Sequence, residues 1–121
     1  MKLRVVSFGR RGADPFDREV ETYRSRVDRR WAAEDIAHRP AAGGRDQDPA
    51  RALASEAEVA RRTVPPGWTL AVLDERGATR TSVDFAERLR QLEDGGAPGI
   101  AFVVGSDLGI DPDLVRSADL V

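Results

Sequence analysis

The sequence predicts an α/β fold, with a mainly parallel sheet and helices on both of its faces. Short apolar runs alternate along the chain with segments whose apolar residues recur every three or four positions. The two strongest runs, 68–73 and 100–104, are apolar on both faces, as strands must be when helices cover both sides of a sheet. A length of 121 residues with 40% hydrophobic content fits one domain spanning 1–121.

The first strand is expected over 3–8 and is closed by Gly9. A helix then begins at Asp14, which can cap free backbone N–H groups, with Pro15 in the first helical position. One face of this helix is apolar and consists of Phe16, Val20, Tyr23 and Val27.

A short, partly exposed strand near a sheet edge is expected over 31–38. Asp48 and Pro49 repeat the cap-and-proline pattern and start a second helix, which ends before Pro65. The inner face of this helix is formed by Leu53, Ala57 and Ala60.

The run 68–73 predicts a central strand that opens into a loop. Thr81 and Asp84 have the spacing of a capping box, so a third helix is expected there, and its apolar face consists of Phe85, Leu89 and Leu92. A further buried strand follows over 100–104. Asp111 and Pro112 start a short helix that runs to about 117, and 119–121 are expected to open one more strand.

Composition excludes several classes of function. The chain has no cysteine, so disulfides and thiolate metal sites are excluded, in agreement with a cytoplasmic protein. The apolar start is too short for a signal peptide or a membrane span, and no membrane partner is expected. The formal charge of −2 means that contact with RNA would need a local basic patch.

Two loops are the candidate ligand site. They are 73–77 and 105–109, and each follows one of the two most apolar strands. Ligands bind beyond the carboxyl ends of parallel strands, and the loops face each other if those strands are neighbours. Gly105 has no Cβ, so a ligand could approach its backbone closely, although by spacing alone a plain turn has the greater weight. The glycine spacing fits neither the dinucleotide fingerprint nor a P-loop, which disfavours a nucleotide-dependent oxidoreductase.

Other catalytic templates are weaker. His38, the single histidine, is interpreted as a solvated surface residue on an edge strand without a partner. Asp74 and Glu75 are interpreted as solvated loop acids and receive no catalytic role. No metal site is proposed, because Asp111 with Asp113 suits a helix cap and Glu56 with Glu58 suits a solvated helix face.

Two groups of arginines could meet RNA phosphates. The first group crowds the end of the first helix, where a solvated face is the favoured interpretation; it consists of Arg24, Arg26, Arg29 and Arg30. Arg10 and Arg11 follow the first strand, on the expected ligand side of the sheet, and are equally compatible with an RNA contact and with a solvated loop.

Four short motifs occur in order along the whole chain. They are the opening Met1-Lys2-Leu3 strand that leads to Gly9, the Glu21-x-Tyr23 pair in the first helix, Leu73-Asp74-x-x-Gly77, and Phe102-Val103-Val104-Gly105-x-x-x-Gly109. In this order and spacing the sequence resembles the ribosomal RNA large subunit methyltransferase H family, a minimal branch of the SPOUT methyltransferases, which have a knotted α/β fold.

The resemblance implies an enzyme that transfers a methyl group from S-adenosylmethionine to N3 of a pseudouridine in the large-subunit (23S) rRNA of the assembled ribosome. It also implies a homodimer. Leu73 corresponds to the family's cofactor contact after the central strand, and Gly105 to the first glycine of its Gly-Gly pair, so both are expected to bind S-adenosylmethionine. The resemblance assigns no catalytic residue here.

Two departures from the family pattern qualify this expectation. Ser106 stands where the family commonly has the second glycine. The family continues with a Thr-Leu-Pro-His-type cofactor loop and a C-terminal helix that complete the knot, so the domain is expected to be incomplete at its C-terminal end and this chain alone to be inactive. The alternative function is a non-catalytic module that binds RNA or a protein through the exposed edge of its sheet.

Overall fold

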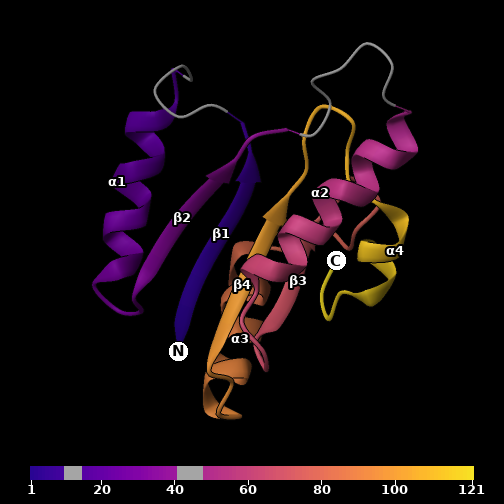
Figure 1. Ribbon diagram of the computed structural model, residues 1–121. Helices are drawn as coiled ribbons and strands as arrows, with labels where there is room; N and C mark the ends of the chain where they lie inside the picture. The colour runs from indigo at the N-terminus through magenta and orange to yellow at the C-terminus, as the bar shows by residue number, and fades with distance from the viewer. Residues whose placement is uncertain (10–14, 41–47) are drawn as a thin grey trace.

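The computed structural model describes residues 1–9, 15–40 and 48–121, and in these ranges four strands form one sheet (Figure 1). The strands are β1 (Lys2–Phe8), β2 (Ala33–His38), β3 (Thr69–Leu73) and β4 (Gly99–Val104). Their order is β2-β1-β4-β3, and every pairing is parallel. The predicted α/β class with a parallel sheet is confirmed, and β2 lies at an edge as expected. The prediction of a central strand over 68–73 was wrong, because β3 lies at the other end of the strand order and only an isolated bridge to Leu120 flanks it there.

Helices connect the strands and cover both faces of the sheet. They are α1 (Asp17–Asp28), α2 (Pro49–Thr63), α3 (Ser82–Asp94) and α4 (Pro112–Ser117). Figure 1 shows α2 in front of the sheet and α3 behind it. Side chains of α2 and α4 pack on one face of the sheet, while α1 and α3 lie on the other.

The face under α2 and α4 carries the tighter core. Val6, Val72 and Val103 point to this side from three neighbouring strands and are at most 1% exposed. Ala57 and Ala60 of α2 and Leu114 of α4 close over them, each no more than 2% exposed. The predicted inner face of the second helix is therefore confirmed at its two alanines.

The opposite face is covered unevenly. Near β3 and β4, α3 packs Leu89 and Leu92 against a cluster that includes Ile100 and Phe102. The rings of Phe85 and Phe102 lie 5.9 Å apart, measured between centroids. The predicted apolar face of this helix is confirmed.

Helix α1 has no buried residue. Its predicted apolar side chains line a hollow of about 420 Å³ above β1 and β2, but Phe16 is 67% exposed, Val20 41% and Tyr23 64%. The helix begins at Asp17 with Phe16 as its N-cap residue, later than predicted from Pro15. The expected cap at Asp14 lies outside the described residues.

The other helix starts follow the predictions with one exception. The carboxylate of Asp48 accepts a hydrogen bond from the Ala50 N–H at 3.1 Å, and Pro49 occupies the first helical position. The Thr81 hydroxyl accepts one from the Asp84 N–H at 3.1 Å. Asp111 precedes Pro112 as predicted, but its side chain makes no capping hydrogen bond.

The last residues run beside β3. Leu120 forms a parallel bridge with Ala71, and the Leu120 carbonyl accepts a hydrogen bond from the Val72 N–H at 2.9 Å. The Asp119 carboxylate accepts another from the Leu70 N–H at 2.8 Å. The extended segment predicted over 119–121 therefore pairs with the edge of the sheet.

Within the described ranges, no helix is long and apolar enough to cross a membrane.

Candidate functional site

The two candidate loops meet at the carboxyl edge of the sheet. Strands β3 and β4 are paired neighbours, and Leu73 is in register with Val104, so both loops start side by side. Residues 73–76 and 104–110 line a shared hollow of about 590 Å³. The prediction that these loops face each other is confirmed, and Leu73 and Gly105 both lie in the wall of the hollow.

The first loop is held by its own carboxylate. Asp74 Oδ1 accepts hydrogen bonds from the Arg76 backbone N–H at 2.8 Å and from Arg76 Nε at 3.0 Å, while Oδ2 accepts one from Nη2 at 3.1 Å. These bonds to Arg76 lower the pKa of Asp74 below its ordinary value. The Asp74 side chain is 6% exposed, so its interpretation as a solvated loop acid was wrong. The carboxylate is ionised and fixes the turn.

Gly77 ends the same turn at a position where a side chain would not fit. Its N–H donates to the Asp74 carbonyl at 2.9 Å. A Cβ added at Gly77 would lie 2.7 Å from the carbonyl carbon of Val121, which is closer than real Cβ atoms come to backbone. The glycine of the Leu73-Asp74-x-x-Gly77 motif therefore lets the loop pass against the segment beside β3.

The second loop folds back on itself. Ser106 and Gly109 form an antiparallel bridge, and the Gly109 N–H donates to the Ser106 carbonyl at 2.9 Å. Gly109 has a φ of +89°, which L-residues with a side chain rarely adopt. A Cβ added at Gly105 would lie 2.4 Å from the Gly109 carbonyl oxygen. The loop itself thus fills the space that the sequence suggested was kept free for a ligand, and the cofactor contact at Gly105 stays a prediction.

Ser106 connects this loop to helix α2. Its hydroxyl donates a hydrogen bond to Glu56 Oε1 at 2.7 Å and accepts one from the Leu108 N–H at 3.3 Å. Glu56 is 4% exposed, so its interpretation as part of a solvated helix face was wrong, while Glu58 is exposed as expected. Glu56 lies three positions after Leu53 and four after Ala52, on the apolar face of α2, and that periodicity is the signal that would have identified it.

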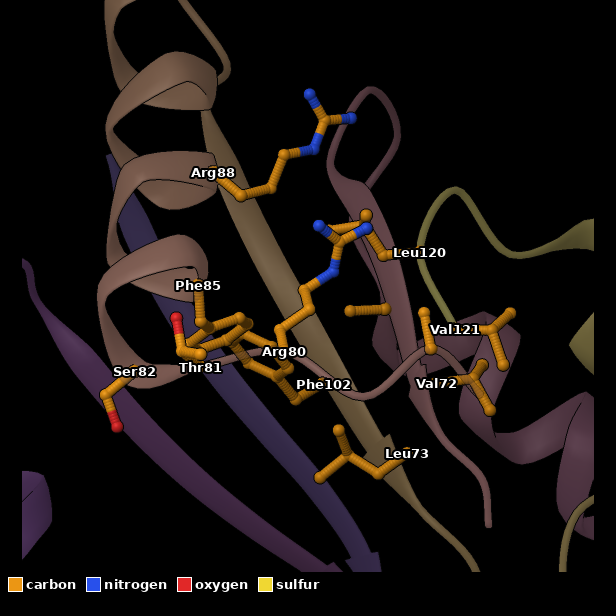
Figure 2. Close-up of a pocket in the computed structure, with 12 residues that line it drawn as sticks. Val72, Leu73, Arg80, Thr81, Ser82, Phe85, Arg88, Phe102, Leu120 and Val121 are labelled. Atoms are coloured by element: carbon orange, nitrogen blue, oxygen red, sulfur yellow. The ribbon is translucent and has the colours of Figure 1, made fainter. Parts of the chain in front are cut away.

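Leu73 separates the shared hollow from a second one. Its side chain is 55% exposed and lines both. The second hollow has a volume of about 280 Å³ and lies between the start of α3 and the edge of β3. Figure 2 shows Phe85 and Phe102 in its apolar floor, with Arg80 and Arg88 reaching across its rim. An apolar floor below two cations gives this hollow a different chemistry from the polar loop site.

His38 has partners that the sequence did not reveal. Its Nε2 lies 2.9 Å from the Thr63 hydroxyl at the end of α2, and its ring is 5.9 Å from that of Phe8, measured between centroids. The interpretation of a solvated histidine without a partner was wrong. The Thr63 contact ties the edge strand β2 to α2, and the ring contact joins it to the end of β1.

The arginines near the end of α1 are largely engaged within the protein. Arg24 donates to both carboxylate oxygens of Glu21, at 2.7 and 2.9 Å, and Glu21 raises the pKa of Arg24. Arg30 donates to Glu93 of α3 at 2.8 Å, and Arg26 lies over the Tyr23 ring at 5.1 Å. Arg24 is therefore engaged within the helix, while Arg26, Arg29 and Arg30 are exposed, as the interpretation of a solvated face predicts. Arg10 and Arg11 lie outside the described residues.

The described residues contain no cluster of three metal-ligating side chains of the histidine, cysteine or carboxylate type. The loop hollow offers other polar groups. Exposed carboxylates of Glu75 and Asp107 line it, together with the guanidinium of Arg76. Such a lining can accept hydrogen bonds from hydroxyl and ammonium groups of a small ligand.

Comparison with known proteins identifies the family. The family model described as "Predicted SPOUT methyltransferase" matches residues 1–121. A protein of Ruegeria sp. named "Ribosomal RNA large subunit methyltransferase H" is 36% identical over 120 residues, which cover 98% of this chain and 76% of that protein. Proteins of the same name from Methylobacterium nodulans and Rhodopseudomonas palustris are 36% and 34% identical, covering 100% and 99% of this chain and 76% and 77% of their own lengths. The chain therefore belongs to the SPOUT methyltransferase family.

Proposed function

We propose that this protein methylates N3 of a pseudouridine in the large-subunit (23S) rRNA of the assembled ribosome, with S-adenosylmethionine as the methyl donor. The observation that carries the proposal is the hollow between loops 73–77 and 105–109, in a chain that belongs to a methyltransferase family. The similar proteins named "Ribosomal RNA large subunit methyltransferase H" support the choice of rRNA.

The residues of the loop hollow fit the proposed cofactor. A volume of about 590 Å³ lies within the usual range for small-molecule sites. The exposed side chain of Leu73 offers an apolar surface for a flat ring, while Glu75 and Asp107 can accept hydrogen bonds from sugar hydroxyls or an ammonium group. When bound, S-adenosylmethionine supplies an electrophilic methyl group on a sulfonium.

The chain's own groups would bind and orient the reactants. The Asp74–Arg76 contacts and the Ser106–Gly109 bridge hold the two loops in fixed shapes, so the site is largely preformed. Preformed loops lower the entropy cost of placing a methyl donor near its acceptor. We assign no catalytic base.

We propose that the protein acts as a homodimer in the cytoplasm, where assembled ribosomes are found. The exposed apolar side chains of α1 support association, because Phe16, Val20 and Tyr23 lie beside an apolar hollow. Sedimentation of the purified chain over a range of concentrations tests the dimer.

Leu73 gives the clearest test of the cofactor site. Leu73→Asp is expected to weaken S-adenosylmethionine binding at least tenfold, measured by titration calorimetry, because a charge replaces the apolar contact surface. Val83→Asp is the matched control, since Val83 is 78% exposed on α3 and does not line the loop hollow. Unchanged affinity in Leu73→Asp would contradict the assignment. Gly105 is a poorer test, because any side chain there collides with Gly109.

Methyl transfer distinguishes the proposal from its alternative. Purified ribosomes that lack the modification are incubated with the chain and with S-adenosylmethionine labelled in its methyl group, and the labelled nucleotide is identified. Transfer to N3 of a pseudouridine supports the enzyme and overturns the expectation that this chain alone is inactive. Binding of ribosomes or rRNA without transfer favours the non-catalytic module.

A further inference from the structure

We propose that Glu56 of α2 is a positioning residue, which holds loop 105–109 in its site-forming shape through the hydroxyl of Ser106. The loop forms one wall of the shared hollow, while Glu56 is a buried residue of α2 itself. The expected effect of Glu56 on cofactor binding rests on the proposed function. The expected effect of Glu56 on the loop does not.

The burial of Glu56 makes its hydrogen bonds important. A carboxylate that is 4% exposed has lost most of its contact with water, and burying such a group is unfavourable unless hydrogen bonds replace that contact. The Ser106 hydroxyl donates to it at 2.7 Å, within the short range typical of bonds to charged acceptors. The bond joins residues 50 positions apart and therefore ties the loop to a different element of the fold.

The same hydroxyl organises the loop. It accepts a hydrogen bond from the Leu108 N–H, while the backbone of Ser106 forms the bridge with Gly109. Glu56 thus orients Ser106, and Ser106 in turn holds the shape of the turn. This turn places Gly105 and Gly109 in the wall of the hollow.

The space beside this contact is small. Glu56, Gly105 and Gly109 border a cavity of only about 10 Å³, which is at the lower limit of the space one water needs. If the Ser106 hydroxyl is removed, the bond that joins the loop to Glu56 is lost, and Glu56 no longer holds the loop in this shape. A loop that occupies its site-forming shape for a smaller fraction of the time binds its ligand more weakly by that fraction.

The test is a double-mutant cycle on S-adenosylmethionine affinity, measured by calorimetry. Ser106→Ala and Glu56→Ala are each expected to weaken binding at least tenfold, because both remove the buried hydrogen bond between the Ser106 hydroxyl and the Glu56 carboxylate. The double variant should be no weaker than the weaker single variant, because both changes remove the same contact. Glu56→Gln keeps an acceptor oxygen and should stay within about threefold of the wild type. Glu58→Ala, on the exposed side of the same helix, is the matched control.

Amide hydrogen exchange supplies a readout that does not depend on the cofactor. In Ser106→Ala and Glu56→Ala, exchange of the Gly109 N–H should accelerate at least tenfold, while that of Val6 in β1 changes little. Equal acceleration at both amides would show that Glu56 stabilises the fold as a whole, and would overturn the proposal. Unchanged exchange at Gly109 would do the same.

The two proposals fail in different ways. If the wild-type chain binds no S-adenosylmethionine while Gly109 still responds selectively, the proposed function is wrong and the link between Glu56 and the loop stands. If the wild type binds the cofactor but the two single effects simply add in the double variant, Glu56 does not act through Ser106.

Discussion

The two faces of the sheet are covered by helices of similar amphipathic pattern but with different results. On one face, Ala57 and Ala60 of α2 are at most 2% exposed and pack directly on strand residues. On the other face, α1 leaves Tyr23 64% exposed above an apolar hollow. We call these the closed face and the open face.

The difference shows how residue size and position determine burial. Small side chains let α2 lie close over the neighbouring strands β1, β4 and β3, where Val6, Val103 and Val72 provide a continuous floor. Helix α1 carries larger side chains and lies above β1 and the edge strand β2. Its apolar residues line the hollow without filling it, so the pattern that predicts a helix does not predict a closed core.

Polar contacts partly replace packing on the open face. Glu93 of α3 accepts hydrogen bonds from the Trp31 indole and, at 2.8 Å, from Arg30, both in the turn between α1 and β2. The Trp31 bond above all, together with the charge of Arg30, lowers the pKa of Glu93. These contacts connect the two helices of this face.

The largest effect is expected at Leu114 on the closed face. Leu114→Ala should lower the free energy of unfolding by about 3 kcal/mol, because it leaves a cavity beside side chains that cannot fully collapse. Urea denaturation measures the change. Val83→Ala removes aliphatic atoms at a 78% exposed position and should change stability little. Equal losses of unfolding free energy in both variants would contradict the expectation that the buried position matters more than the exposed one.

Overpacking α2 should have the next largest effect. Ala60 is 0% exposed, so Ala60→Leu forces the helix away from the sheet and should cost about 1–3 kcal/mol. Ala54→Leu on the exposed side of the same helix should be nearly neutral, because leucine is a good helix former. A tolerated leucine at position 60, measured by thermal or urea unfolding, would show that the closed face has free space.

Glu93→Gln should have a smaller effect that depends on pH. The folded-state pKa of Glu93 is lowered, so its contribution is fully present above the ordinary glutamate pKa of about 4.3 and is lost as pH falls through the lowered value. The variant should be less stable than the wild type at pH 7, and the difference should shrink below about pH 4. Urea midpoints at a series of pH values measure it. A difference that does not shrink as the pH falls below about 4 would contradict the ionic contribution.

The smallest effect is expected at Tyr23 on the open face. Tyr23→Ser should change the free energy of unfolding by less than about 0.5 kcal/mol in dilute solution, because the ring is largely exposed. A larger loss that grows with protein concentration would show that another copy of the chain covers this face. A larger loss independent of concentration would show that the ring is buried within one chain.

Much of the fold was accessible from the sequence because local patterns encode it. The capping residues Asp48 and Thr81 mark their helix starts with side chains that bond to nearby backbone. The apolar run that ends at Leu73 predicts a buried parallel strand. Because β3 and β4 are paired neighbours, Leu73 and Gly105 then line the same hollow. Both signals depend on residues close in sequence.

Two of the misjudged contacts join distant segments. Glu56 meets Ser106 across 50 positions, and His38 meets Thr63 across 25. Asp74 is the local exception, since its partner Arg76 is two residues away and the loop geometry alone reveals their pairing. When only the sequence is known, a polar residue is interpreted as solvated. That interpretation is wrong where the fold places a hydrogen-bonding partner beside it.

The sequence by itself determined the parallel α/β class, the order of the elements and the edges at which their loops open, because periodicity and helix caps are local properties. The tertiary structure decided which apolar helix face is covered and which buried carboxylate holds a loop. These outcomes depend on what lies opposite each side chain, because burial and pairing are properties of two surfaces.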